Sequence, residues 1–206
     1  MSLSSIRTRV PTLSRAYAYR PRAVSLTAPK ESRPVRSPDV PAYHALLRTL
    51  GVSDRLDDKV AVQVFTHKSH RHGAEGYNEK LAFLGRRVLE VRVSEYLLAR
   101  PTSSPSAIAG RDVDALVGER IRDVSNADRV GRFALRHEPF AALMRWKARD
   151  ERDPVASGQV KVASETLLAL IGALELQAGA LSAKEFVTRT VIPGLRIFED
   201  APSTTA

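Results

Sequence analysis

One short stretch of the chain gathers the side chains with the widest range of chemistry. His67, His70 and His72 lie close enough together in the sequence to suggest a zinc site. Zinc in proteins is held by Cys, His and acidic side chains. The chain has no Cys, and no convincing acidic partner stands at ligand spacing from these histidines. We therefore expect no metal site here and interpret the histidines as loop residues.

The same stretch raises the question of nucleophilic catalysis. Ser69 lies near His67, as a nucleophile lies near its base, but nothing in the sequence supplies an orienting acid or an oxyanion loop. Further along, Trp146 with Arg145 and Lys147 resembles a stacking platform for RNA bases. A half-buried Trp on a short helix is the interpretation that we favour for this second group.

Helices must position all of these side chains. From Pro41 onward the apolar residues recur with helical spacing, and no alternating strand pattern or internal repeat is present. We predict an all-α fold in one domain over residues 41–198, followed by a tail at 199–206. The expected helices cover residues 42–50, 57–65, 78–98, 106–129, 138–149, 155–178 and 182–192. Gly85 and Gly172 are predicted to permit close approaches between helices, because a glycine has no side chain. They do not fit a phosphate-binding loop, because no strand precedes either one.

The positive charge is concentrated before this domain. The 206 residues carry a formal charge of +9, but residues 1–38 hold eight basic side chains and one acidic one, against 24 and 22 in the remainder. Residues 1–17 contain no acid and place Ile6, Val10, Leu13 and Tyr17 on one helical face. This pattern is typical of a mitochondrial transit peptide. No apolar run is long enough to span a bilayer.

Residues 18–40 form a second, proline-rich basic segment. Such a composition cannot bury a core and predicts an extended or disordered arm. The arm is either a plain linker or a segment that lies among RNA phosphates and gains by counterion release. In the second case the binding residues are Arg20, Arg22, Lys30, Arg33 and Arg36.

Four short patterns, in order, resemble the ribonuclease III catalytic-domain family. They are FTHKS at 65–69, NEKLAFLG at 78–85, LVGER at 116–120 and ASETLLALIG at 163–172. The resemblance covers roughly residues 42–198. Members that cut double-stranded RNA carry Glu, Glu and Asp on one helix, at spacings of three and four, and Asp and Glu three apart on a second. These spacings place the carboxylates on one face of each helix, so the two faces converge on Mg²⁺, which takes oxygen ligands and generates the attacking hydroxide.

In this chain most of those carboxylates are missing. The first position is Glu79, and the Asp position of the second helix is Glu165. The other three positions are occupied by Ala82, Arg86 and Leu168. A guanidinium stays protonated at physiological pH and repels a metal ion, and a leucine offers no lone pair. The resemblance therefore implies the fold without nuclease activity, metal or cofactor.

Arg86 could have a structural role in place of the lost metal. We hypothesise that its guanidinium fills part of the former metal space and pairs with Glu165, or with Glu79, because carboxylates gathered without a metal repel each other. The alternative is that Arg86 points to solvent or to a partner. Members of the family usually dimerise through the same helix, so four apolar residues could form either an interface or core. They are Phe83, Leu84, Val88 and Val91.

An emptied catalytic domain with a mitochondrial address resembles the ribonuclease III-like proteins of the fungal mitochondrial large ribosomal subunit. The resemblance implies a structural role in the mitochondrial matrix, packed on ribosomal RNA and on other large-subunit proteins. One expected neighbour is a second ribonuclease III-like subunit, as a heterodimer partner. The alternatives are a mitochondrial double-stranded-RNA endoribonuclease and a free RNA-processing cofactor.

Overall fold

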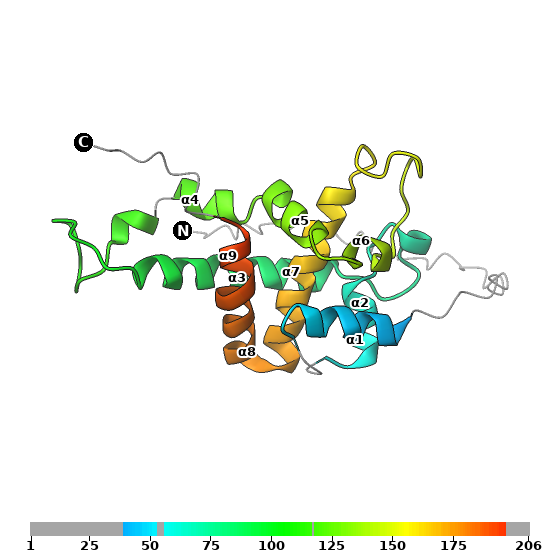
Figure 1. The fold of residues 1–206 in the computed structure, drawn as a ribbon, viewed down its shortest axis with the longest axis horizontal. Coiled ribbons are helices and arrows are strands. Elements are labelled where there is room, and N and C mark those ends of the chain that lie inside the picture. The colour runs from blue at the N-terminus through cyan, green and yellow to red at the C-terminus, as the bar shows by residue number, and fades with distance from the viewer. Residues whose placement is uncertain (1–38, 53–55, 117, 197–206) are drawn as a thin grey trace, which may run out of the picture. The chain divides into compact units, whose positions relative to one another are not determined.

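Helices joined by loops make up the described part of the chain (Figure 1). A computed structural model describes residues 39–52, 56–116 and 118–196. Within these residues, strand-type pairing is limited to two isolated bridges, Thr66 with Arg145 and Ile108 with Arg111. The predicted all-α class is confirmed. The predicted transit peptide, the five RNA-binding residues of the arm and the tail lie outside the described residues.

The helices follow one another from α1 to α9, with two short 3₁₀ helices, η1 and η2, and one π-helical segment, η3, between them. Their bounds are α1 (Val40–Thr49), α2 (Asp58–Val64), η1 (His70–Gly73), α3 (Glu79–Leu98), η2 (Val113–Leu116), α4 (Gly118–Val124), α5 (Ala127–Leu135), α6 (Phe140–Leu143), α7 (Gln159–Gln177), α8 (Gly179–Phe186), η3 (Val187–Val191) and α9 (Ile192–Gly194).

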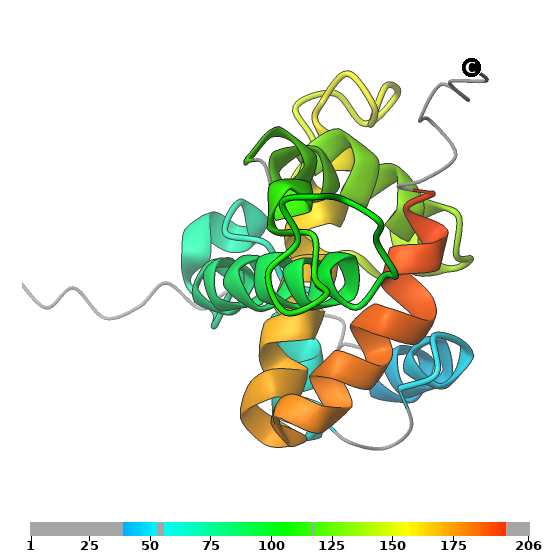
Figure 2. The same cartoon turned by 90° about the vertical axis from the view of Figure 1, so that its left-hand side faces the viewer.

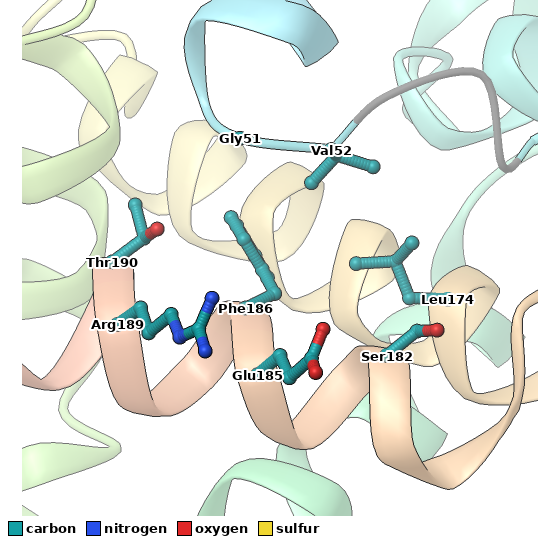
Figure 3. A pocket seen from close by; sticks show the side chains of 8 residues that line it. All are labelled: Gly51, Val52, Leu174, Ser182, Glu185, Phe186, Arg189 and Thr190. Atoms are coloured by element: carbon teal, nitrogen blue, oxygen red, sulfur yellow. The ribbon is translucent and has the colours of Figure 1, made fainter.

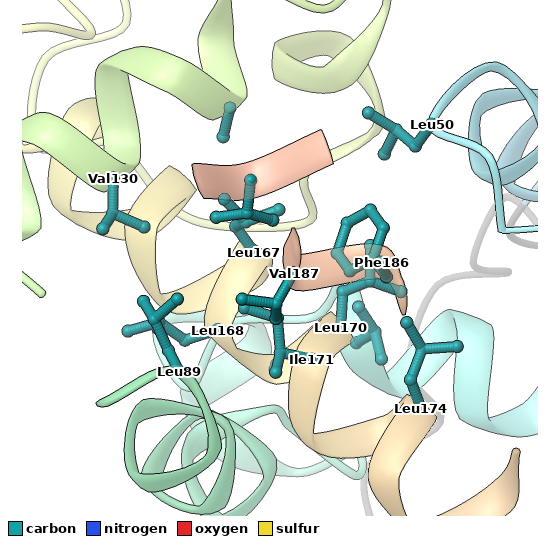
Figure 4. Close-up of a cluster of buried hydrophobic side chains, with 14 of the residues drawn as sticks. Leu50, Leu89, Val130, Leu167, Leu168, Leu170, Ile171, Leu174, Phe186 and Val187 are labelled. Atoms are coloured by element: carbon teal, nitrogen blue, oxygen red, sulfur yellow. The ribbon is translucent and has the colours of Figure 1, made fainter. Parts of the chain in front are cut away.

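The central helix of the core is α7. Its residues from Val162 to Leu174 are buried apart from Glu165, which is partly exposed. Leu167, Leu168 and Ile171 gather there with Leu89 of α3 and Val130 of α5 (Figure 4). A helix that is apolar nearly all round belongs in a core, because every face must be covered.

The predicted close approach of two helices is confirmed at the crossing of α3 and α7. A Cβ on Gly85 would lie 1.8 Å from the carbonyl oxygen of Leu168, and one on Gly172 would lie 2.2 Å from that of Leu81. No real side chain tolerates such distances, so the two backbones touch only because both positions are glycine. This contact brings the side of α3 that carries Glu79 against the side of α7 that carries Glu165.

A buried asparagine fixes where α3 begins. The Nδ2 of Asn78 donates to the carbonyl of Val64 at 3.1 Å, and its backbone N–H donates to the carbonyl of Thr66 at 2.9 Å. Asn78 is fully buried and makes no side-chain cap to its own helix. The first turn of α3 is therefore anchored to the end of α2.

Two predicted helices are wrong in extent. In place of one helix over 106–129, the chain forms η2, α4 and α5, and Asn126 caps α5 by accepting from the N–H of Asp128 at 2.8 Å. In place of a helix over 138–149, only Phe140–Leu143 is helical, and Arg145 pairs with Thr66 as a bridge. The Asn126 cap and the long-range pairing of Arg145 with Thr66 set the ends of these helices. Helical spacing in the sequence indicates neither contact.

The last helices run as one column. The segments α8, η3 and α9 follow each other without a break and cross α3, as Figures 1 and 2 show. Pro193 lies within α9, so the predicted stop at Pro193 falls slightly too early. None of the described helices is both long and apolar enough to cross a membrane.

Candidate functional site

A small pocket opens where α3 and α7 cross. It has a volume of about 170 Å³. The lining residues are Glu79, Ala82, Phe83 and Arg86 from α3, and Glu165 and Leu168 from α7. All five positions singled out on the resemblance to ribonuclease III thus face one space. The helix spacing and the glycine contact together account for this convergence.

Both glutamates of the pocket already have basic partners from the loop that follows α2. Lys68 Nζ lies 2.8 Å from Glu79 Oε1, with both side chains about half exposed. His67 Nε2 lies 3.2 Å from Glu165 Oε2, and this pair is much more enclosed, at 12% and 23% side-chain exposure. The contact between His67 and Glu165 is therefore the less solvent-exposed of the two.

The hydrogen bonds around His67 fix its tautomer. Its Nδ1 accepts from the backbone N–H of Ser69 at 3.1 Å, so the ring proton is on Nε2 and is donated to Glu165. Ser69 Oγ lies 2.9 Å from the same Nδ1 and accepts from the backbone N–H of Lys147 at 3.0 Å. The chain therefore does supply an acid that orients His67, contrary to our expectation. These hydrogen bonds connect the loop after α2 to α7 through Glu165, and to the segment after α6 through Lys147.

The electrostatics of Glu165 follow from this contact. The hydrogen bond from His67 holds the pKa of Glu165 below its usual value of 4.5, although burial acts in the opposite direction. Lys161 and Lys68 lower the pKa further through their charge. Glu165 is therefore an ionised carboxylate that is stabilised by the hydrogen bond from His67 and by the nearby charges of Lys161 and Lys68.

Arg86 does not form the ion pair that we hypothesised. Its Nη1 donates to the backbone carbonyl of Ser125 at 3.4 Å, and no ion pair within 4 Å joins it to Glu79 or Glu165 in the described part of the chain. Ser125 directly follows α4, where helix carbonyls lack intrahelical partners and attract cations. Those carbonyls, together with the basic partners already held by both glutamates, explain the different outcome.

The residues present do not fit the Mg²⁺ site of a nuclease. Two carboxylates remain, each with a basic neighbour, while Arg86 adds a fixed positive charge and Leu168 an apolar wall. Magnesium needs several oxygen ligands in near-octahedral geometry. Across residues 39–52, 56–116 and 118–196, no three His, Asp or Glu side chains gather closely enough to hold a metal ion. His67, His70 and His72 are among the described side chains that form no such group.

Sequence reasoning missed the role of Arg145. Its guanidinium reaches Glu75 at 2.7 Å, the hydroxyl of Thr66 at 3.0 Å and the Nε2 of His70 at 3.1 Å. Burial, with the nearby charge of Arg145, lowers the pKa of His70 and keeps that ring neutral. Some 70 residues separate Arg145 from these partners, so no local pattern reports the contact. The adjoining Trp146 is half-buried against the core, as we favoured, but it lies after the end of α6 and not on a helix.

The four apolar residues considered as interface or core divide into two pairs. Phe83 and Val91 are exposed, at 68% and 53%, whereas Val88 is buried and Leu84 packs against the core. The guanidinium of Arg87 lies 5.7 Å from the centre of the Phe83 ring. An apolar patch with a basic rim therefore lies along the outer face of α3.

A second pocket lies away from this site, between the end of α1 and the column formed by α8 and η3 (Figure 3). Its lining residues are Gly51, Val52, Leu174, Ser182, Glu185, Phe186, Arg189 and Thr190. None of the positions predicted from the sequence lies there.

Comparison with known families and proteins gives consistent results. A sequence model of the family described as Ribonuclease-III-like matches residues 57–195. A Neurospora crassa protein named large ribosomal subunit protein mL57 is 30% identical over 165 residues, which are 75% of this chain and 61% of that protein. A ribonuclease 3 from a Geobacillus species is 25% identical over 175 residues, or 82% of this chain and 65% of that protein. The chain thus spans less than two thirds of the length of these relatives.

Solved structures show the same fold. The nuclease domain of ribonuclease III from Campylobacter jejuni is similar with a TM-score of 0.56 at 24% identity, over 71% of this chain and 90% of that one. At such identity the likeness concerns the fold alone.

Proposed function

The chain belongs to the ribonuclease III-like family, and from that membership we propose that it is a non-catalytic structural component of the mitochondrial large ribosomal subunit. The pocket at the crossing of α3 and α7 supports this most directly. Where the resemblance leads us to expect five carboxylates, the pocket offers two, each beside a basic side chain, and Arg86 contributes a positive charge. Such a donor set does not hold the metals that hydrolysis needs.

The ribosomal assignment rests on the relatives and on the sequence before the domain. A protein named for the large ribosomal subunit is 30% identical over 75% of this chain. Residues 1–17 have the character of a mitochondrial transit peptide, which supports a location of the mature protein in the matrix. The basic arm that follows supplies Arg20, Arg22, Lys30, Arg33 and Arg36 for ribosomal RNA, by counterion release.

The outer face of α3 fits a protein neighbour. Phe83 and Val91 are large exposed apolar residues. Val91 also lines a groove, and the other lining residues are Arg87, Val88, Arg92 and Glu175. Exposed aromatic residues next to arginines are characteristic of protein interfaces. We assign this face to another large-subunit protein, namely a second ribonuclease III-like subunit in a heterodimer.

Sedimentation tests the ribosomal role. Mitochondrial lysate containing the tagged full-length chain is separated on a sucrose gradient, first at low salt and then at high salt. Persistent co-migration with large subunits at high salt is the expected result, because a built-in component is held by many contacts. A chain that dissociates at high salt and remains at the top of the gradient would instead be a free RNA-processing cofactor.

A nuclease assay tests the absence of catalysis. The purified chain is incubated with double-stranded RNA and Mg²⁺ or Mn²⁺, alone and with Glu165→Gln as the matched variant. We expect no cleavage by either protein. Cleavage by the unmodified chain that Glu165→Gln abolishes would identify an endoribonuclease and overturn the proposal.

A further inference from the structure

The turn that joins α7 to α8 exposes two leucines. Leu176, in the last turn of α7, is 66% exposed, and Leu181, in the first turn of α8, is 71% exposed. Of the large apolar side chains in the described part of the chain, Leu181 is the most exposed. We call residues 176–181 the leucine turn. All of its residues are exposed except Ala178, which is partly exposed. Exposed runs of about four apolar residues are rare unless they bind a partner.

Hydrogen bonds to two other parts of the fold hold the leucine turn in place. Gln177 Nε2 donates to Asp57 Oδ2 at 2.7 Å, and the backbone N–H of Asp57 donates to Gln177 Oε1 at 3.0 Å. Arg92 Nη2 of α3 donates to the carbonyl of Ala180 at 3.5 Å. Gly179 has a φ of +83°, so α8 can begin directly where α7 ends. The two leucines are therefore presented by an anchored backbone.

The leucine turn adjoins the outer face of α3. Val91 of that face lines a groove of about 190 Å³ together with Arg92 and Glu175, among others. Glu175 directly precedes Leu176, and Arg92 reaches Ala180 within the turn itself. In Figures 1 and 2, the orange start of α8 lies below the green α3. The groove therefore connects the apolar part of α3 to the leucine turn.

A protein that covers the outer face of α3 needs more surface than this face offers by itself. A stable interface buries about 800 Å² on each partner and involves about 20–30 residues a side. The large exposed apolar side chains of α3 are Phe83 and Val91. The leucine turn adds two more at the other side of the groove, so it is the place where such an interface can continue.

The chemistry of the turn favours a protein over RNA. Phosphate backbones are bound chiefly by Lys and Arg side chains, and residues 176–183 contain no charged side chain, although 27% of the whole chain is charged. The next basic residue, Lys184, already pairs with Glu95 at 3.1 Å. Leucine side chains gain free energy by leaving water for contact with other apolar groups.

We propose that the leucine turn docks in an apolar recess of the same protein that covers the outer face of α3, so that one partner spans both surfaces across the groove. The proposal rests on the ribosomal role proposed above and adds a second point of attachment to it. Two anchors on separate elements fix the orientation of a partner, whereas a single contact leaves it free to rotate.

The first test replaces both leucines by charged residues that suit the ends of their helices. Leu176→Lys places a cation in the last turn of α7, and Leu181→Asp places an anion in the first turn of α8, so each favours its helix and the net charge is unchanged. The tagged double variant is produced beside the unmodified chain, and the ratio of the two is measured in whole mitochondria and in large subunits from a sucrose gradient. We expect this ratio to be about tenfold lower in large subunits, because loss of an interface anchor weakens binding by about that factor.

The matched control is Ile108→Lys with Val155→Asp. It changes two similarly exposed apolar residues on other segments and also keeps the net charge. We expect its ratio to be the same in large subunits as in whole mitochondria. Equal ratios for the leucine variant and this control would overturn the proposal.

Photo-crosslinking tests what covers the turn without disturbing the fold. Benzoylphenylalanine is introduced in place of Leu181 in one full-length chain and in place of Val91 in another, and intact large subunits are irradiated. We expect crosslinks from both positions to the same protein, identified by mass spectrometry. A crosslink from position 181 to ribosomal RNA, to a second copy of the chain or to a protein that position 91 does not reach would overturn the proposal.

The unmodified chain in the same gradient separates these results from failure of the proposed function. If it remains with large subunits at high salt while the leucine variant and its control behave alike, the ribosomal role stands and only the contact of the leucine turn is lost. If the unmodified chain stays at the top of the gradient, the ribosomal role itself fails.

Discussion

At the scale of single residues, a few substitutions decide what the pocket can do. Leu168 is 1% exposed and belongs to the same buried cluster as Leu89 and Val130, although it also lines the pocket. Glu165 keeps its charge through His67, whose proton is fixed on Nε2. The polar groups of the pocket are thus bonded to other protein groups, and a buried core residue, Leu168, occupies a position where the resemblance leads us to expect a metal ligand.

Truncating Leu168 tests whether it is a core residue. Leu168→Ala is expected to lower the free energy of unfolding by about 2–5 kcal/mol, because it leaves a cavity beside α3. Leu168→Met conserves volume and is expected to cost less than about 1.5 kcal/mol. Urea unfolding followed by circular dichroism measures both variants. A loss from Leu168→Ala no larger than that from Leu168→Met would contradict a core role.

Acid sensitivity follows from the Glu165 contact. Because the pKa of Glu165 is lowered from 4.5 in the folded chain, its contribution to stability is complete above that pH and is lost as pH falls through the folded-state pKa. As the pH falls below about 5, the free energy of unfolding should therefore decrease more for the unmodified chain than for Glu165→Gln. Urea unfolding at several pH values shows this, with Glu151→Gln in an exposed loop as the control. Parallel profiles for the unmodified chain and Glu165→Gln would refute the assignment.

At the scale of elements, the crossing of α3 and α7 sets the geometry of the site. Backbone contact at Gly85 and Gly172 brings Glu79 and Glu165 into one pocket. The loop after α2 then adds its own anchors, through Asn78 at the start of α3 and through Arg145 after α6. The pocket is therefore a product of helix packing.

Adding one methyl group at the crossing tests this element. Gly85→Ala forces a Cβ to within 1.8 Å of the Leu168 carbonyl oxygen, so the helices must separate. We expect a loss of more than about 3 kcal/mol, since overpacking and lost burial both act. Gly76→Ala is the matched control, because its Cβ would meet nothing nearer than 3.8 Å. Comparable unfolding midpoints for the two variants would rule out a tight crossing.

At the scale of the whole molecule, one outer surface is proposed to contact a protein partner. The outer face of α3 exposes Phe83 and Val91, whereas Val88 on the same helix is buried. Under the proposed ribosomal role, we assign this exposed face to a neighbouring protein.

Charging the apolar face tests the protein contact. Phe83→Asp with Val91→Asp changes two exposed side chains, so stability should alter by less than about 1 kcal/mol while incorporation into large subunits falls. Gradient sedimentation of tagged chains measures incorporation, and thermal unfolding measures stability. Ile108→Asp with Val155→Asp alters two equally exposed residues on other segments. Equal incorporation of both double variants would remove the α3 face from the interface.

The sequence by itself determined those properties that depend on residue type and local spacing. Helical periodicity indicated the all-α class, and the identities of Ala82, Arg86 and Leu168 showed which carboxylates are missing, because side-chain chemistry does not depend on the fold. The small size of Gly85 and Gly172 also indicated correctly that helices approach closely at both positions.

Only the tertiary structure decided which groups meet. It placed His67 on Glu165, turned Arg86 to the Ser125 carbonyl and separated exposed Phe83 from buried Val88. It also divided the long helix expected over 106–129, where Asn126 caps α5. Each outcome depends on side chains competing for partners from distant segments. Such competition is settled by packing, because the strongest available partner is known only once the helices have come together.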